Sequence, residues 1–335
     1  MGKKGNTFVS VLIGLIIFGF FLYQLGIEAV LLIIDNINFF YLGIYTLFTS
    51  MVFVMWTIRW QIILYGYGKK PGFFRLLKQT IAGYSVAYIT PTIRLGGEPL
   101  RAFMLKKEAG IDYKTGSSSI IIDKFIEFLG TIIFGVIGLF FVLTLKIDIL
   151  LKLGFMFIIF LAIIILAVFY YRSLNGKGSF SSLFNFLRLH KVKKFQGFDK
   201  TLIEVEEQIE DFFKNHKKYF LLSLFSYIIY IAIVFFETKF LLLSFGIETN
   251  IIEIILTLTI LGLIAFVPVP AGLGFLEGSQ SGLFHLLKGE GSIGFAFSLL
   301  GRIRALIFVA IGFGLITYFS GNQIKQRVRQ QYKKI

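Results

Sequence analysis

The chain has 335 residues, of which 56% are hydrophobic and 16% are charged, and its mean hydropathy is +0.80. This composition lies far outside that of soluble globular proteins, and it leaves no room within these residues for a separate soluble catalytic domain. The formal net charge is +15 and there is no cysteine, which excludes disulfides, thiol catalysis and thiolate metal sites.

Long apolar stretches follow one another along the chain. A helix needs about 20 mostly apolar residues to cross the hydrocarbon of a bilayer. Seven stretches meet this requirement, at about 7–25, 39–64, 117–145, 149–171, 219–245, 251–268 and 293–319. The first follows Lys3 and Lys4 as in a signal peptide, but no small-residue cleavage site follows it, so we expect an uncleaved helix. The sequence therefore predicts an all-α, polytopic membrane helical bundle, with one transmembrane domain over 1–335.

The distribution of charge predicts the orientation in the cell membrane. Basic residues gather at 69–78, in the segment 172–218 and after 320. In the segments 26–38 and 246–253, by contrast, the only charged residues are acidic. The positive-inside rule then places both termini and the 172–218 segment in the cytoplasm. Topology and anionic lipid explain the basic balance, so we expect no nucleic-acid partner.

One segment outside the spans has helical spacing. From 199 to 218, apolar residues recur every three or four positions opposite glutamates, which is typical of an amphipathic helix. The apolar positions are Leu202, Val205, Ile209, Phe212 and Phe213. We interpret this helix as lying on the inner face of the protein or in the headgroup layer, after a Ser/Gly/Asn-rich linker at 173–182. A partner-binding role is the alternative.

Two apolar segments, 73–105 and 271–288, adjoin breaks of the same kind. In each break a proline, Pro91 or Pro270, precedes glycines, and a glutamate follows seven residues after the proline, at Glu98 or Glu277. Proline removes a helix hydrogen bond, and glycine tolerates the bends that follow. Inside a bilayer such breaks are tolerated only where protein or a wet cavity covers them, and paired breaks are a pointer to a polar site. We expect two re-entrant segments. The two segments are compatible with an inverted repeat, but their spacing does not require one.

Charged residues within the predicted spans are candidates for function, because each costs about 2.5–3.5 kcal/mol at a helix centre. Asp123 and Glu127 share one helical face, and Lys124 can pair with Glu127. The alternative is that these residues lie near the headgroups and extend toward them. In the last span, Arg302 suits phosphate, or pairs structurally with Glu277 or Glu127.

The first break supplies further candidates. Arg94, Glu98 and Arg101 cluster there, and the two arginines are the cations that we expect to meet a phosphate. Arg101 can equally be an ordinary positive-inside residue. Three weaker candidates are Arg59, expected to anchor the inner end of its span, and Glu237 with Lys239, expected to form a local ion pair.

Signals for an enzyme are missing from the sequence. The histidines His190, His216 and His285 do not have metal-ligand spacing, and neither a phosphate-binding Gly-x-x-x-x-Gly-Lys-Ser/Thr run nor a Gly-x-Ser-x-Gly elbow occurs. The sequence therefore predicts no metal, cofactor or catalytic residue.

The motifs at the breaks resemble those of a known family, the lysylphosphatidylglycerol synthase transmembrane region, which is the flippase-like domain of the multiple peptide resistance factor. The resemblance covers nearly the entire chain. It is carried by Gly97-Glu98-Pro99-Leu100-Arg101, by Asp123-Lys124, and by Pro268-Val269-Pro270-Ala271-Gly272-Leu273-Gly274 with Glu277. Thr92 and Lys124 depart from the family pattern, which often has glycine and arginine there.

The resemblance implies a protein that moves polar-headed phospholipids or aminoacyl lipids between leaflets. It places Gly97, Glu98, Arg101, Pro270, Gly272, Gly274 and Glu277 in the lipid-handling region. These 335 residues do not include the aminoacyltransferase domain of full-length relatives, so a lipid-modifying enzyme is expected to be a separate protein. A membrane-embedded transferase with Asp123 or Glu127 as base, and a non-transporting assembly partner, are the alternatives.

Overall fold

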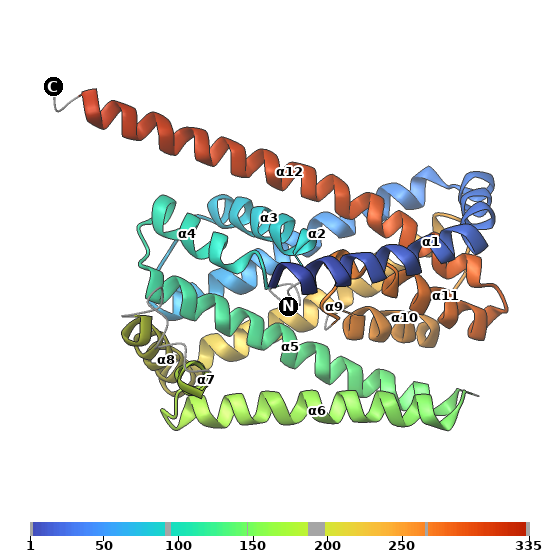
Figure 1. The fold of residues 1–335 in the computed structure, drawn as a ribbon, viewed down its shortest axis with the longest axis horizontal. Coiled ribbons are helices and arrows are strands. Elements are labelled where there is room, and N and C mark those ends of the chain that lie inside the picture. The colour runs from blue at the N-terminus through green and yellow to red at the C-terminus, as the bar shows by residue number, and fades with distance from the viewer. Residues whose placement is uncertain (1–2, 91–94, 146, 187–197, 265–266, 333–335) are drawn as a thin grey trace. The chain divides into compact units, whose positions relative to one another are not determined.

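The computed structural model describes residues 3–90, 95–145, 147–186, 198–264 and 267–332. Within these ranges every regular element is a helix, which confirms the predicted all-α class (Figure 1). In chain order the elements are α1 (Lys3–Asn36), α2 (Phe39–Gly66), α3 (Phe73–Ile89), α4 (Glu98–Ala109), α5 (Tyr113–Thr144), α6 (Ile149–Leu174), α7 (Ser179–Phe186), α8 (Phe198–Asn215), α9 (Lys217–Leu243), α10 (Ile251–Ile264), the 3₁₀ turn η3 (Pro270–Gly272), α11 (Phe275–Lys288) and α12 (Gly291–Tyr332).

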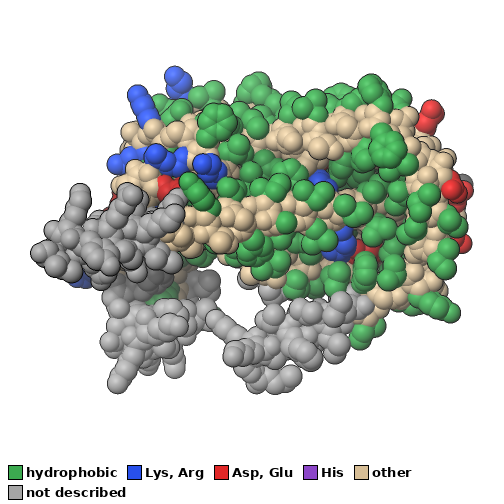
Figure 2. All heavy atoms as spheres, turned by 90° about the horizontal axis from the view of Figure 1, so that it is seen from above, with side chains coloured by type: hydrophobic (Ala, Val, Ile, Leu, Met, Phe, Trp, Pro, Cys, Tyr) green, Lys and Arg blue, Asp and Glu red, His purple; other side chains and the backbone are tan. Residues whose placement is uncertain are grey.

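The surface of the helices fits a lipid environment. Among the described residues, six helices are long and apolar enough to cross a membrane: α1 from Phe18, α2, α5, α6, α9 and α12 up to Gly321. Hydrophobic side chains cover much of the face in Figure 2, and α6 exposes them around most of its circumference. Soluble proteins rarely expose apolar patches of this extent. The protein is therefore a multi-pass membrane protein.

Several helices differ in length from the predicted spans. The helix predicted at 7–25 continues in α1 to Asn36, because the single Gly26 does not end it and the mostly apolar residues 27–34 contain no proline. The span predicted at 293–319 continues in α12 to Tyr332. In the segment predicted at 251–268, the structure describes a helix from Ile251 to Ile264. Its 14 residues rise by about 21 Å, less than the hydrocarbon thickness. Pro268 follows shortly after, and the residue before a proline avoids helical angles.

Contacts divide the chain into two compact units. The first unit consists of Met1–Asp35, Phe74–Arg101 and Ile264–Ile335, and the second consists of Asn36–Phe73 and Ala102–Leu263. The first unit contains both sequence breaks, together with α1 and α12. Both units are assembled from segments that are distant in the sequence.

In the second unit, α2 and α9 form the most extensive pair of helices. The amide of Asn38, before α2, donates to the carbonyl of Ser244, after α9, over 2.8 Å, so the two helices are antiparallel. Phe48 of α2 stacks on Phe236 and Phe240 of α9. Aromatic contacts of this kind add about 0.5–1.5 kcal/mol beyond burial.

The predicted amphipathic helix is confirmed as α8. Its apolar side chains Val205, Ile209, Phe212 and Phe213 are buried in a core shared with α5 and α9. Part of the predicted linker at 173–182 forms the short helix α7, since Glu206 of α8 accepts hydrogen bonds from the amides of Phe180 and Ser181. A carboxylate at a helix N-terminus satisfies amides that have no partner within the helix.

The start of α5 is fixed by a capping aspartate outside the span. The amide and hydroxyl of Thr115 donate to the Asp112 carboxylate over 2.9 and 3.0 Å. Burial raises the pKa of Asp112, but these hydrogen bonds outweigh it and lower the pKa below its usual value. The cap therefore stabilises the fold above the ordinary aspartate pKa of about 4, and this contribution is lost as the pH falls through the lowered pKa.

Glycines allow the helices of the second unit to approach closely. A Cβ at Gly130 of α5 would lie 2.1 Å from the ring of Tyr227 in α9, and a Cβ at Gly138 would lie 1.8 Å from the Thr259 hydroxyl oxygen in α10. Small residues at contacts between membrane helices permit this kind of packing.

We predict that Gly130→Ala destabilises the protein. The added methyl group must displace Tyr227, whose hydroxyl lies 3.1 Å from that of Thr131, and overpacking of this kind costs about 1–3 kcal/mol. Thermal unfolding in detergent should show a lower Tm. Gly154→Ala in α6 is the matched control, because a Cβ there has nothing within 4 Å. Equal Tm values for the two variants would contradict the packing argument.

Candidate functional site

The second break of the first unit has a strained backbone. Ala271 has φ 54°, and Gly272 and Gly274 have φ 61° and 79°. Residues other than glycine rarely adopt positive φ, and an alanine there costs roughly 1–2 kcal/mol. The predicted residues Pro270, Gly272 and Gly274 therefore shape a turn that ends immediately before α11.

This turn places Glu277 in the first helical turn of α11. One carboxylate oxygen accepts a hydrogen bond from the amide of Gly274 over 2.8 Å, and the other pairs with Nε of Arg302 in α12. The exposed fractions are 1% for Glu277 and 9% for Arg302. Of the two structural pairings expected for Arg302, the structure shows the one with Glu277.

Arg302 connects the second break to the end of α3. Its Nη1 lies 3.3 Å from the carbonyl oxygen of Ala271, within the second break, and 3.5 Å from the hydroxyl of Tyr88, in the last turn of α3. The second break and the helix that precedes the first break therefore contact one buried guanidinium. Sequence reasoning placed Arg302 among the candidates but did not identify Tyr88.

The first break brings two backbone segments into contact. A Cβ at Gly97 would lie 1.9 Å from the carbonyl oxygen of Gly83 in α3, so no larger residue fits there without moving the backbone. Glu98 and Arg101, in the first turn of α4, form an ion pair of 2.9 Å. Arg101 is buried beside Gly83. Arg94 and Thr92 lie outside the described residues.

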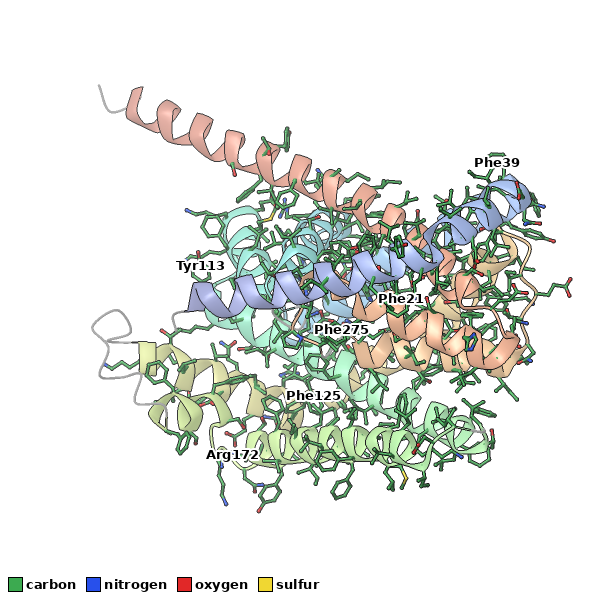
Figure 3. All side chains as sticks on the ribbon, turned by 45° about the vertical axis from the view of Figure 1, so that its right-hand side comes forward. Phe21, Phe39, Tyr113, Phe125, Arg172 and Phe275 are labelled. Carbon is green, nitrogen blue, oxygen red and sulfur yellow. The ribbon has the colours of Figure 1, made fainter. Side chains whose placement is uncertain are left out.

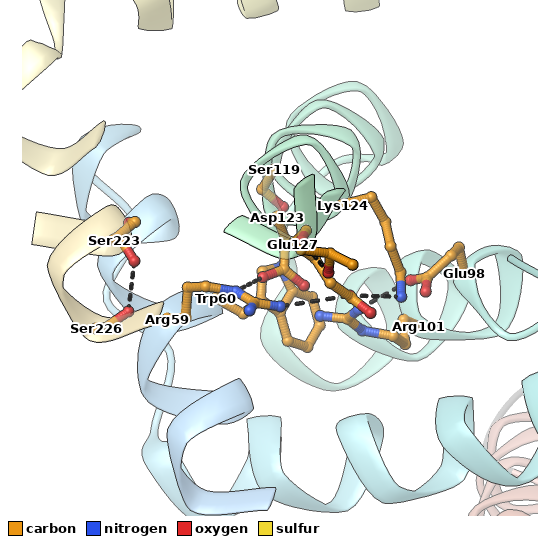
Figure 4. A network of polar contacts seen from close by, with 11 residues as sticks. Arg59, Trp60, Glu98, Arg101, Ser119, Asp123, Lys124, Glu127, Ser223 and Ser226 are labelled. Carbon is orange, nitrogen blue, oxygen red and sulfur yellow. Dashed lines mark hydrogen bonds and ion pairs between the residues drawn. The ribbon is translucent and has the colours of Figure 1, made fainter. Parts of the chain in front are cut away.

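A second buried ionic network lies within the second unit (Figure 4). Arg59 of α2 donates from Nε to Asp123 over 2.6 Å, and its Nη2 lies 3.5 Å from Glu127. Lys124 pairs with Glu127 over 2.9 Å, as the spacing predicted. Two positive and two negative charges thus balance on α2 and α5.

The network corrects the interpretation of Arg59 as an anchor at the inner end of its span. Arg59 and Asp123 are each 2% exposed, so neither extends toward the headgroups. The ring of Tyr227 lies 5.8 Å from the guanidinium carbon of Arg59, a cation–π contact that adds to the pairing. Arg59 and Asp123 are 64 residues apart, and no sequence spacing indicates their pairing.

Other predicted residues have different partners. Glu237 of α9 is buried and accepts a hydrogen bond from the hydroxyl of Thr49 in α2 over 2.8 Å, a contact between helices rather than the expected local ion pair with Lys239. Across the described ranges, there is no group of three or more His, Asp or Glu side chains that could hold a metal ion.

A family model described as the lysylphosphatidylglycerol synthase TM region matches residues 7–312. The chain belongs to this family. It is similar to a UPF0104 membrane protein of Pyrococcus horikoshii, with 24% identity over 312 residues that cover 89% of this chain and 92% of that protein. A UPF0104 membrane protein of Methanothermobacter thermautotrophicus is 24% identical over 315 residues, covering 90% and 88%. No solved structure matches the chain.

The family match confirms the resemblance drawn from the motifs. It includes both breaks and the two buried networks, while the C-terminal part of α12 lies beyond it. The lysylphosphatidylglycerol synthase TM region is thus, in this chain, a helical membrane domain with paired charges inside its spans.

We predict that Arg59→Met strongly destabilises the protein. The substitution leaves Asp123 buried without its nearest cation, and breaking a buried pair in this way costs about 3–5 kcal/mol. A second substitution, Asp123→Leu, should restore most of the Tm in detergent, because it removes the buried carboxylate that has lost its arginine. Arg75→Met, at an exposed position of α3, is the matched control. A wild-type Tm for Arg59→Met would contradict the proposed stabilisation.

Proposed function

We propose that the protein is a flippase or transporter that moves a polar-headed lipid, with a phosphate or an aminoacyl group, between the leaflets of the cell membrane. The single observation that carries this proposal is the buried Arg302, which contacts the second helix break and the end of the helix that precedes the first. Membership of the lysylphosphatidylglycerol synthase TM region family supports it.

The physical problem is to carry a charged head across about 30 Å of hydrocarbon. Broken helices at membrane depth expose backbone dipoles and charged side chains where lipid offers none, and transporters use such breaks for their binding sites. In the first unit, Arg302 and Arg101 supply cations for a phosphate, and Glu277 and Glu98 supply carboxylates for an amine or a proton.

The other predicted residues support this site in different ways. Gly97, Gly272 and Gly274 allow the close approach and the positive φ angles that place the charged groups. Asp123 and Glu127 are part of a balanced network, in which we propose that they exchange partners with a passing head group. The acyl tails stay in the surrounding lipid.

The proposed topology follows from the same charges. With both termini and the 172–218 segment in the cytoplasm, the basic residues face the anionic inner leaflet. The alternative role of α8 as a docking helix is disfavoured, since its apolar side chains are already buried against other helices of the second unit. A separate lipid-modifying enzyme is the partner that we propose.

We predict that Glu98→Gln with Glu277→Gln slows lipid movement at least tenfold. Both substitutions keep the side-chain size but remove a carboxylate that pairs with an arginine. The assay uses purified protein in liposomes containing fluorescent phospholipids, and it measures the fraction of label that becomes accessible to a membrane-impermeant quencher. Gel filtration first checks that each variant is folded.

The matched control is Glu28→Gln with Glu248→Gln, which makes the same change in charge at two exposed positions. The control should move lipid at the wild-type rate. If the Glu98/Glu277 variant also matches wild type, the two glutamates have no role in transport. If wild-type protein moves no phospholipid faster than empty liposomes, the proposed function is wrong.

A further inference from the structure

Arg302 uses only part of its guanidinium in the structure. Nε pairs with Glu277, and Nη1 reaches Ala271 and Tyr88. Nη2 is buried, and among the described residues it has no hydrogen-bond partner. A buried donor without an acceptor costs about 1–3 kcal/mol, and more when it is charged. The Nη2 atom therefore lacks an acceptor among the described residues.

Arg59, which is also buried, has its donors directed at carboxylates. It presents Nε to Asp123 and Nη2 to Glu127. The missing acceptor at Nη2 of Arg302 is thus not a property of every buried arginine in this protein. It occurs where α12 contacts the second break.

We propose that Nη2 of Arg302 is a binding site for one oxygen of a phosphate group, supplied by a lipid head group. The inference rests on the proposed function for the source of the phosphate. Charge-assisted hydrogen bonds from arginine to phosphate are short, and they are about twice as strong as neutral ones. Glu277 has the role of a positioning residue, because it holds Nε and so fixes the orientation of the guanidinium.

The charge balance narrows the class of ligand. Glu277 already neutralises Arg302, so each negative charge on the ligand adds to the net charge of a buried site. A singly charged phosphodiester is therefore favoured over inorganic phosphate, which carries more charge at neutral pH. A head group with its own ammonium adds no net charge at all.

Helix α1 covers this site within the first unit. The ring of Phe18 lies 5.7 Å from the guanidinium carbon of Arg302 and stacks on Phe295 of α12 at 6.3 Å. Phe21, labelled in Figure 3, lies against Gly278 of α11. These residues lie on one helical stripe, because i and i+3 share a face. The ring of Phe18 therefore lies beside the guanidinium that would receive the phosphate.

Binding to the full-length protein in detergent tests the proposal. The probes are dihexanoyl phosphatidylethanolamine, dihexanoyl phosphatidylglycerol, inorganic phosphate and dihexanoylglycerol, which lacks phosphate, and calorimetry gives each Kd. We expect the two phosphodiesters to bind, inorganic phosphate to bind more weakly and dihexanoylglycerol not to bind at Arg302. Arg302→Lys keeps the charge but loses the fork, and it should weaken phosphodiester binding at least tenfold.

Arg304→Lys is the matched control, two residues along the same helix, and it should bind as wild type does. If Arg302→Lys does not fold, Phe18→Ala tests the same site without changing a charge, and it should lower the phosphodiester Kd several-fold, because it uncovers the guanidinium. Equal affinity of wild type and Arg302→Lys, or an unchanged Kd in Phe18→Ala, would overturn the proposal. Inorganic phosphate that binds as tightly as the diesters supports the site but assigns it to free phosphate.

The lipid-transport assay separates this inference from the proposed function. Arg302-dependent phosphate binding without lipid movement would leave the site in place and remove the transport function. Lipid movement that Arg302→Lys does not change, together with unchanged binding, would remove the site and leave the transport function.

Discussion

The cost of charge inside a membrane governs the arrangement of this protein. A charged side chain within a span costs several kilocalories per mole unless a counter-charge and hydrogen bonds accompany it. Arg59 has Asp123 and Glu127, and Glu277 has Arg302 and the amide of Gly274, which lies immediately before its own helix. These pairs join α2 to α5 and α11 to α12, so the same contacts that permit burial of charge also fix which helices are neighbours.

The helix breaks follow the same principle for the backbone. Between α10 and α11 the amides of Val267, Gly272 and Leu273 donate to nearby carbonyls, and the amide of Gly274 donates to Glu277. Ala271 adopts a left-handed conformation, and Arg302 donates a hydrogen bond to its carbonyl. Arg302 donates to the Glu277 carboxylate and to the carbonyl of the strained Ala271, and it thereby stabilises the break. Its remaining donor, Nη2, lies at the same place.

The sequence is most informative about features that are local. Proline and glycine with a glutamate seven residues after the proline predict both breaks, and helical spacing predicts α8 and the Lys124–Glu127 pair, because these features depend on neighbours along the chain. Pairing between distant segments has no such signature. Arg59 looks like a residue at the end of a span until Asp123 is placed beside it. Likewise, nothing in the local pattern of Tyr88 connects it to Arg302. The predicted end of the first span, at residue 25, is too early, because one glycine and one glutamate do not end a helix among apolar residues.

The division of the chain distributes these ion pairs. The chain passes between the units at 35/36, 73/74, 101/102 and 263/264, yet Arg302 with Glu277 lies in the first unit, and Arg59 with Asp123 and Glu127 lies in the second. Each unit therefore contains an arginine and a carboxylate that are buried together. Because a buried charge is costly without a counter-charge, each unit meets this cost with residues of its own.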